Sequence, residues 1–298
     1  GHSGSWFNPT NGNGNQGGLA GTATITGSGA TIQTGTAQND GDNETGALAQ
    51  SSNMGMILAG EKMSAKTLDD YYRRFGLGSP SGTGFPGETA GILTPVDEMN
   101  GTQRYTVMFG QGLSVTAVQA AGVFQTIAND GVRLPPTLVS ASRAPGGEWV
   151  QAPRPTGVRV VSTKAARETN RMLEGVVSAE GTAPEARVPG YRVAGKTGTA
   201  EKPDRGGYSR NRLISSFSAV FPYDDPQYVV LVMLDEPQGN ASTYGYATAG
   251  YTAAPAAGSI IERIAPILGV ERLDDPEARA ELVRAALSPA EDTPEPRI

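Results

Sequence analysis

The order of the periodic segments predicts an α+β fold, in which an antiparallel sheet is flanked by helices. Up to residue 177, apolar residues recur mainly with the spacing of α-helices. After Pro189 the period shortens, and three strand-like segments follow one another with turn residues between them. A last helical segment, 254–270, follows the strands. Strands joined by short turns pair antiparallel, so we expect one such sheet covered by helices.

Composition divides the 298 residues into three parts. Residues 1–46 are rich in Gly, Thr and Asn, and we expect an exposed loop or insertion there. Alternating pieces at 22–27 and 30–35 leave a loose hairpin as the alternative. Residues 47–273 form the expected folded domain, and the charged, Pro-containing residues 274–298 are expected to be a frayed tail.

Cap and stop residues set the limits of the expected helices. These helices are 47–63, as two pieces around a polar break, 65–75, 114–130, 162–177 and 254–270. Thr116 or Ser114 can cap the third, and Ser162 or Thr163 the fourth. In the last helix, the residues expected to cover the sheet are Ile260, Ile261, Ile264 and Ile267.

The strand-like segments are 191–202, 213–222 and 227–237. Residues 204–211, rich in Gly and polar side chains, are expected to form the first turn, and residues 223–226 the second.

Charge and composition exclude several classes of function. The chain has 24 basic and 30 acidic residues, a net charge of −6, which argues against nucleic acid as a partner. It has no cysteine, and its one histidine, His2, lies at the end of the chain, so we expect neither a metal site nor a Ser-His-Asp triad. Acid–base chemistry is then left to Lys, Tyr and carboxylates. We expect no cofactor.

The segment Gly195-Lys196-Thr197-Gly198-Thr199 is the sharpest candidate for chemistry. In a strand, Lys196 and Gly198 share one face, and Thr197 and Thr199 share the other. Glycines on both sides of Lys196 remove side-chain bulk, which allows an extended peptide to pair with the strand edge. The ammonium group and two hydroxyls suit a peptide that ends in a carboxylate. A solvated lysine beside a bulge glycine is the alternative.

Ser51-Ser52-Asn53 lies between two helical pieces. On a loop, Ser51 and Asn53 can point the same way. Asn53 offers both a donor and an acceptor, and the Ser51 hydroxyl can pass a proton along. Taken alone, the tripeptide is more typical of a helix cap or turn.

Together the two motifs resemble the S-x-N and K-T-G elements of penicillin-recognising serine acyltransferases. Three longer segments resemble class B penicillin-binding proteins, in particular their cell-division members: RFGLGSPSGTGFPGETAGILTP, FGQGLSVTAVQAAGVFQTIANDGV and VPGYRVAGKTGTAEK. The resemblance covers residues 47–270. It implies the transpeptidase fold shared with serine β-lactamases.

The resemblance also implies a role for each matching residue. The family cross-links peptidoglycan stem peptides that end in D-Ala-D-Ala through an acyl-enzyme, and β-lactams acylate the same serine. Ser51 would help shuttle the proton to the leaving amine, and Asn53 would hold the substrate amide. Lys196, Thr197, Gly198 and Thr199 would support the proton network and bind the carboxylate, with the Thr199 N–H in the oxyanion hole.

One family element has no match. None of the five lysines has a serine three positions before it, so the S-x-x-K motif that carries the nucleophile does not occur in these residues. In the family it lies some tens of residues before S-x-N. We therefore expect the nucleophile, its lysine base and a membrane anchor to lie upstream, on a longer protein.

The resemblance implies an extracytoplasmic location, and stem peptides, β-lactams and cell-division membrane proteins as partners. Two other functions remain open. One is a non-catalytic homologue or a β-lactam sensor; the other is a D,D-carboxypeptidase or serine β-lactamase. An intact upstream S-x-x-K would favour the transpeptidase, and a substituted serine would favour a scaffold.

Overall fold

The computed structural model describes residues 22–24, 31–33, 43–204 and 207–273. Its main sheet has three antiparallel strands in the order β7 (Ala194–Asp204), β8 (Gly207–Phe221) and β9 (Tyr228–Asp235). The α+β prediction with an antiparallel sheet is confirmed. The predicted first turn, 204–211, is too long, because β8 already begins at Gly207 and pairs with the end of β7.

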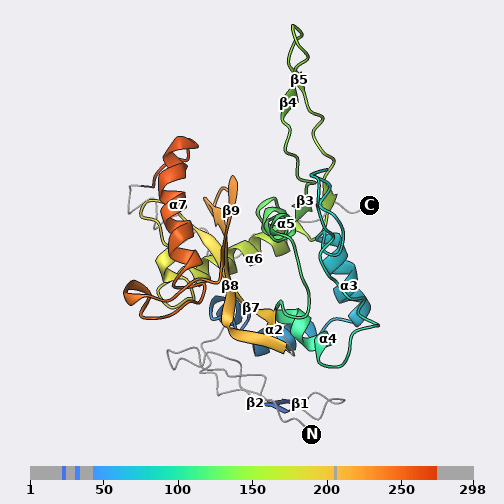
Figure 1. Cartoon of the computed structure of the whole chain (residues 1–298), viewed down its shortest axis with the longest axis vertical. Coiled ribbons are helices and arrows are strands. Elements are labelled where there is room, and N and C mark those ends of the chain that lie inside the picture. The colour runs from blue at the N-terminus through green and yellow to red at the C-terminus, as the bar shows by residue number, and fades with distance from the viewer. Residues whose placement is uncertain (1–21, 25–30, 34–42, 205–206, 274–298) are drawn as a thin grey trace, which may run out of the picture.

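Helices cover both faces of this sheet (Figure 1). On one face lies α7 (Ala253–Ile267), and on the other lie α5 (Ala117–Ala128) and α6 (Thr163–Val176). Alternation along the strands sends side chains to both layers. Phe217 packs among the α7 residues, whereas Ala194 packs with Leu173 of α6. The alternating strand pattern therefore builds one core on each side of the sheet.

The remaining elements surround this centre. In the described part of the chain, the helices among them are α1 (Asn43–Ala49), α2 (Asn53–Gly60), α3 (Ala65–Arg74), α4 (Gln103–Thr106) and the short 3-10 helices η1 (Val107–Phe109), η2 (Pro184–Ala186) and η3 (Ala241–Thr243). Two predicted caps are confirmed. The Thr116 side chain accepts from the N–H of Gln119 and the Gln119 side chain reciprocates, while Ser162 caps α6. The break between helical pieces at residues 50–52 is confirmed as the α1–α2 turn.

The prediction for the last helix was half wrong. Ile261 is fully buried and Ile264 packs against the core, but Ile260 is 40 % exposed and Ile267 is 82 % exposed. Alanines form most of the buried face of α7 instead, at positions 253, 254, 257 and 265. These small side chains, together with Gly258, bring the helix close to the backbone at Ala186. Sequence periodicity cannot separate a helix packed through alanines from one packed through isoleucines.

The start of the chain was expected to be a loop or a loose hairpin, with the folded domain beginning at residue 47. Within residues 1–46, the two alternating pieces pair antiparallel where residues are described, as β1 (Thr22–Thr24) with β2 (Thr31–Gln33), and the expectation of an exposed loop or insertion stays a prediction. Helix α1 begins at Asn43, four residues before the expected boundary at residue 47. The predicted tail, 274–298, lies outside the described residues.

Residues 132–160 form an extended segment that the sequence analysis did not predict. Two short ladders hold it, β3 (Val132–Arg133) with β6 (Val158–Arg159), and β4 (Ala141–Ser142) with β5 (Val150–Gln151). The β4–β5 end projects away from the body of the molecule (Figure 1).

Gly195 provides a test of the packing beneath β7. A methyl group there would lie 2.5 Å from Cζ of Phe217 and 2.6 Å from the carbonyl oxygen of Ser218, and the Phe217 ring is fully buried. We expect Gly195→Ala to lower the free energy of unfolding by about 1–3 kcal/mol in urea titrations.

Gly122 is the matched control. It lies inside α5, and an added methyl group meets no atom within 4 Å. Gly122→Ala should leave the free energy of unfolding unchanged or raise it by up to about 1 kcal/mol. Equal effects of the two substitutions would contradict the packing described for β7.

Candidate active site

The structure brings together two of the predicted site segments that are far apart in the sequence. The ammonium group of Lys196 donates a 2.7 Å hydrogen bond to Oγ of Ser51, across 145 positions of the chain. Ser51 lies in the α1–α2 turn and has a left-handed φ of 55°. The next residue holds this turn in place, because the Ser52 side chain caps α2 by accepting a hydrogen bond from the N–H of Gly55. The turn thus points one serine at the sheet and uses the next as the helix cap.

Lys196 is partly buried, and burial lowers its pKa from 10.5 to about 8. Its ammonium group also donates to the carbonyl oxygen of Thr197 at 3.1 Å and to Oγ1 of Thr197 at 3.3 Å. Each of these acceptors is uncharged. A lysine held in this way exchanges its proton closer to neutral pH than a solvated lysine does.

The rest of the K-T-G segment lies on an open strand edge. Among the described strands, β7 pairs only with β8, so its outer edge carries no partner. Residues 194–201 run in unbroken register, which confirms the strand geometry expected for the motif, and the register shifts only between Glu201 and Lys202. Gly198 faces Ser216 closely, since a methyl group there would lie 2.7 Å from the Ser216 hydroxyl.

Thr199 is exposed on the same strand, and its hydroxyl is oriented by the backbone. Oγ1 of Thr199 accepts a 3.1 Å hydrogen bond from the N–H of Ala249, in the segment that leads into α7. The hydroxyl proton is then directed away from Ala249 and can be donated to an anionic group at the strand edge.

Asn53 lies near this cluster without joining it. It is the first residue of α2, two positions after Ser51, and its side chain is exposed. Within the described part of the chain it makes no hydrogen bond with Lys196 or Ser51. The roles expected for Asn53 and for the Thr199 N–H stay predictions.

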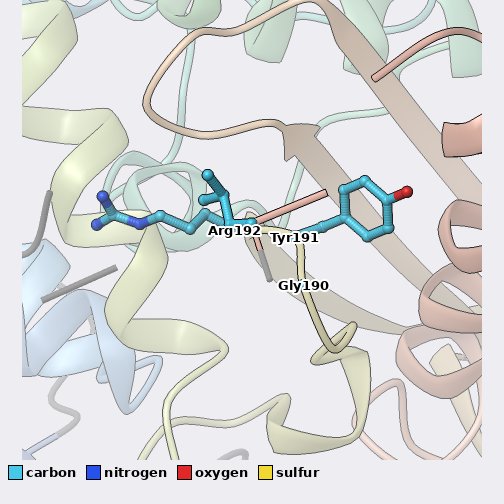
Figure 2. Close-up of a pocket in the computed structure, with 4 residues that line it drawn as sticks. Gly190, Tyr191 and Arg192 are labelled. Atoms are coloured by element: carbon cyan, nitrogen blue, oxygen red, sulfur yellow. The ribbon is translucent and has the colours of Figure 1, made fainter. Parts of the chain in front are cut away.

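The start of β7 is anchored to α6 by Arg192. This buried guanidinium forms two 2.9 Å hydrogen bonds with Glu174 of α6 and lies 4.3 Å from the centre of the Tyr223 ring. Figure 2 shows Tyr191 and Arg192 pointing in opposite directions, as neighbours in an extended chain do. The small pocket at this position is lined by Gly190, Tyr191, Arg192 and Leu273, and none of the predicted site residues lines it.

Two contributors to the cluster were missed by the sequence analysis. Thr182 places its Oγ1 3.0 Å from Oγ1 of Thr197, and Ala249 supplies the N–H that holds Thr199. No residue-type signal marks a backbone donor such as Ala249. Gly181, directly before Thr182, was the available hint of a close backbone approach.

The described residues include no group of three or more His, Cys, Asp or Glu that could hold a metal. What the cluster offers is a lysine with a lowered pKa, linked to a serine hydroxyl, beside an open edge and two further hydroxyls. This arrangement can move protons and bind a carboxylate next to an extended peptide. None of the helices in the described part has the length and apolarity that a membrane span requires.

An α+β fold in which an S-x-N serine accepts a hydrogen bond from a K-T-G lysine is typical of the penicillin-recognising class of proteins. The chain belongs to the penicillin binding protein transpeptidase domain family, whose model matches residues 15–262. The resemblance stated from the sequence motifs is therefore confirmed.

Curated relatives agree with this assignment. The chain is 40 % identical over 219 residues to the penicillin-binding protein PbpB of Mycobacterium tuberculosis, a match that covers 71 % of this chain and 32 % of the relative. It is 39 % identical over 253 residues to the probable peptidoglycan D,D-transpeptidase FtsI of Caulobacter vibrioides, covering 82 % and 40 %. The chain thus spans 32 % and 40 % of the length of these two curated relatives.

Solved structures confirm the fold. Penicillin binding protein 3 from Mycobacterium tuberculosis, without ligand, aligns with a TM-score of 0.73 at 35 % identity, over 82 % of this chain and 56 % of that one. The same protein complexed with ampicillin aligns with a TM-score of 0.72 at 38 % identity, over 78 % and 52 %.

The lowered pKa of Lys196 predicts a pH dependence of stability. Between pH 8 and 10.5 the unfolded chain holds a proton on this lysine that the folded chain has lost, so the free energy of unfolding should rise with pH across this window. Urea titrations of the wild type and Lys196→Met measure it, because the variant lacks this contribution. Parallel pH profiles for the two proteins would show that the lysine titrates normally.

Proposed function

We propose that these residues form the substrate-binding part of a serine-type peptidoglycan D,D-transpeptidase, which cross-links stem peptides and is acylated by β-lactams. The observation that carries the proposal is the 2.7 Å contact between Lys196 and Ser51 beside the open edge of β7. The name of the Caulobacter relative and the ampicillin complex of the Mycobacterium protein support the chemistry.

The substrate is an extended peptide that pairs with the outer edge of β7. Its terminal D-Ala carboxylate would meet Lys196 and the hydroxyls of Thr197 and Thr199. The 3.1 Å bond from Ala249 supports this role for Thr199, because it leaves the hydroxyl proton to be donated. Gly198 keeps the edge free of bulk, Asn53 holds the substrate amide, and the Thr199 N–H faces the developing oxyanion.

Acylation then requires one proton to travel. A serine oxygen attacks the carbonyl carbon of the penultimate D-Ala while the serine proton passes to the neighbouring lysine base. The C–N bond then breaks, and the terminal D-Ala leaves as an amine that takes up a proton. Ser51 passes this proton from the lysine network, since Lys196 donates to its oxygen and its own O–H can face the leaving nitrogen. An amine from a second stem peptide later attacks the ester and gives up a proton to the departing serine oxygen, which forms the cross-link and regenerates the serine hydroxyl.

We assign the nucleophile to a segment outside these residues, because no lysine here has a serine three positions before it. That segment would carry the serine, its lysine base and a membrane anchor, so that the domain acts at the extracytoplasmic face of the membrane. The resemblance to cell-division members supports cell-division membrane proteins as partners.

Labelling with a fluorescent penicillin tests the assignment. The 298 residues alone should form no covalent adduct, and the longer protein with its native upstream sequence should be labelled in a way that survives denaturation. Stable labelling of the 298 residues would show that the nucleophile lies among them. No labelling of the longer protein would favour a non-catalytic homologue.

Lys196 can be tested against a lysine on the same strand. In the longer protein, Lys196→Ala should slow acylation by about 10²–10⁴-fold, the usual worth of a positioned proton-transfer group. Lys202→Ala is the control, because Lys202 pairs with Asp235 at 2.8 Å and Glu236 at 2.9 Å, away from Ser51. Near-normal acylation of Lys196→Ala would remove the role proposed for this residue.

A further inference from the structure

Thr182 contacts both halves of the cluster. Its N–H donates to the carbonyl oxygen of Ala49, the last residue of α1 and two positions before Ser51, at 3.2 Å. Its hydroxyl lies 3.0 Å from Oγ1 of Thr197 on β7. A second contact joins the turn that carries Ser51 to the segment that contains Thr182, because the Gln50 side chain donates to the carbonyl oxygen of Glu180. One residue therefore joins the turn that carries Ser51 to the strand that carries Lys196.

Two glycines allow Thr182 to occupy this position. A methyl group at Gly181 would overlap the carbonyl oxygens of Gly175 and Val176 at the end of α6, so the chain passes over that helix end without a side chain. A methyl group at Gly250 would lie 2.5 Å from the carbonyl oxygen of Thr182. Gly250 follows Ala249, which holds Thr199. The backbone of Thr182 is thus confined between α6, α1 and the start of α7.

The hydrogen bonds around Thr197 have a defined direction. An ammonium group has only protons to give, so Oγ1 of Thr197 accepts from Lys196. Its own proton is then directed to another acceptor, and Oγ1 of Thr182 lies within reach at 3.0 Å. When Thr182 accepts this proton, a lone pair of Thr197 stays turned toward Lys196.

We propose that Thr182 is a positioning residue: its hydroxyl fixes the Thr197 hydroxyl, its backbone fixes the Ser51 turn, and together they aim Lys196 at Ser51. The kinetic part of this inference rests on the proposed transpeptidase function, whereas the contact between the two hydroxyls does not.

The first experiment needs only the 298 residues. NMR of the lysine side chains measures the pKa of Lys196 in the wild type, Thr182→Val and Thr182→Ser, and Lys196→Met identifies the signal. Valine keeps the shape of threonine without its hydroxyl, so Thr197 loses its acceptor and holds the ammonium less well. The pKa of Lys196 should fall in Thr182→Val and stay at the wild-type value in Thr182→Ser. Equal values in all three proteins would overturn the inference.

The second experiment measures acylation by a penicillin in the longer protein. Loss of one hydrogen bond predicts about three- to tenfold slower acylation for Thr182→Val, with the loss in the acylation rate constant rather than in the initial binding step. Thr182→Ser should remain within about twofold of the wild type. A wild-type rate in Thr182→Val, or equal losses in both variants, would contradict a role for the hydroxyl.

Thermal unfolding accompanies both experiments, and Thr182→Ala replaces Thr182→Val if the valine variant does not fold. If the wild-type longer protein is not acylated, the proposed function fails, and the lysine pKa still decides the role of Thr182. If the longer protein is acylated but neither the Lys196 pKa nor the acylation rate changes when the Thr182 hydroxyl is removed, the proposed function stands and the inference fails.

Discussion

The bond from Lys196 to Ser51 is the contact on which the arrangement of the site depends, because it joins residues 145 positions apart. Each partner is held by a different part of the fold. The position of Lys196 is set by the register of β7 on β8 and by the hydrogen bonds from Arg192 to Glu174. The cap at Ser52 sets the direction of the serine. Burial then makes the lysine proton easier to release.

Much of this fold follows from local patterns. Thr116 and Ser162 were identified as caps because a hydroxyl before an apolar helical stretch satisfies free N–H groups at the helix start. The three strands were found because the apolar period shortens after Pro189 and turn residues separate the segments. Ile267 was misassigned because the period of a helix does not say how wide its buried face is. The ladders within 132–160 have two residues in each strand, which is too short to leave a periodic signal.

The site could be predicted only as far as side-chain chemistry marks it. Ser51 and Lys196 were found through their motifs, and their meeting is a property of the three-dimensional fold. Thr182 was missed because a threonine after a glycine is common in turns, and its proposed role depends on Thr197, which only the fold brings next to it. Ala249 was missed because it contributes a backbone N–H, which every residue except proline has.

The outer edge of β7 can also pair with chains other than the proposed substrate. A strand with unsatisfied backbone groups can recruit any extended chain, including another copy in a partly unfolded state, so this margin is a point from which aggregates can grow. The feature cannot be closed without excluding the peptide that it is proposed to receive. Glu201 and Lys202 place charge where the register breaks, which limits how far a wrong chain can extend along the strand.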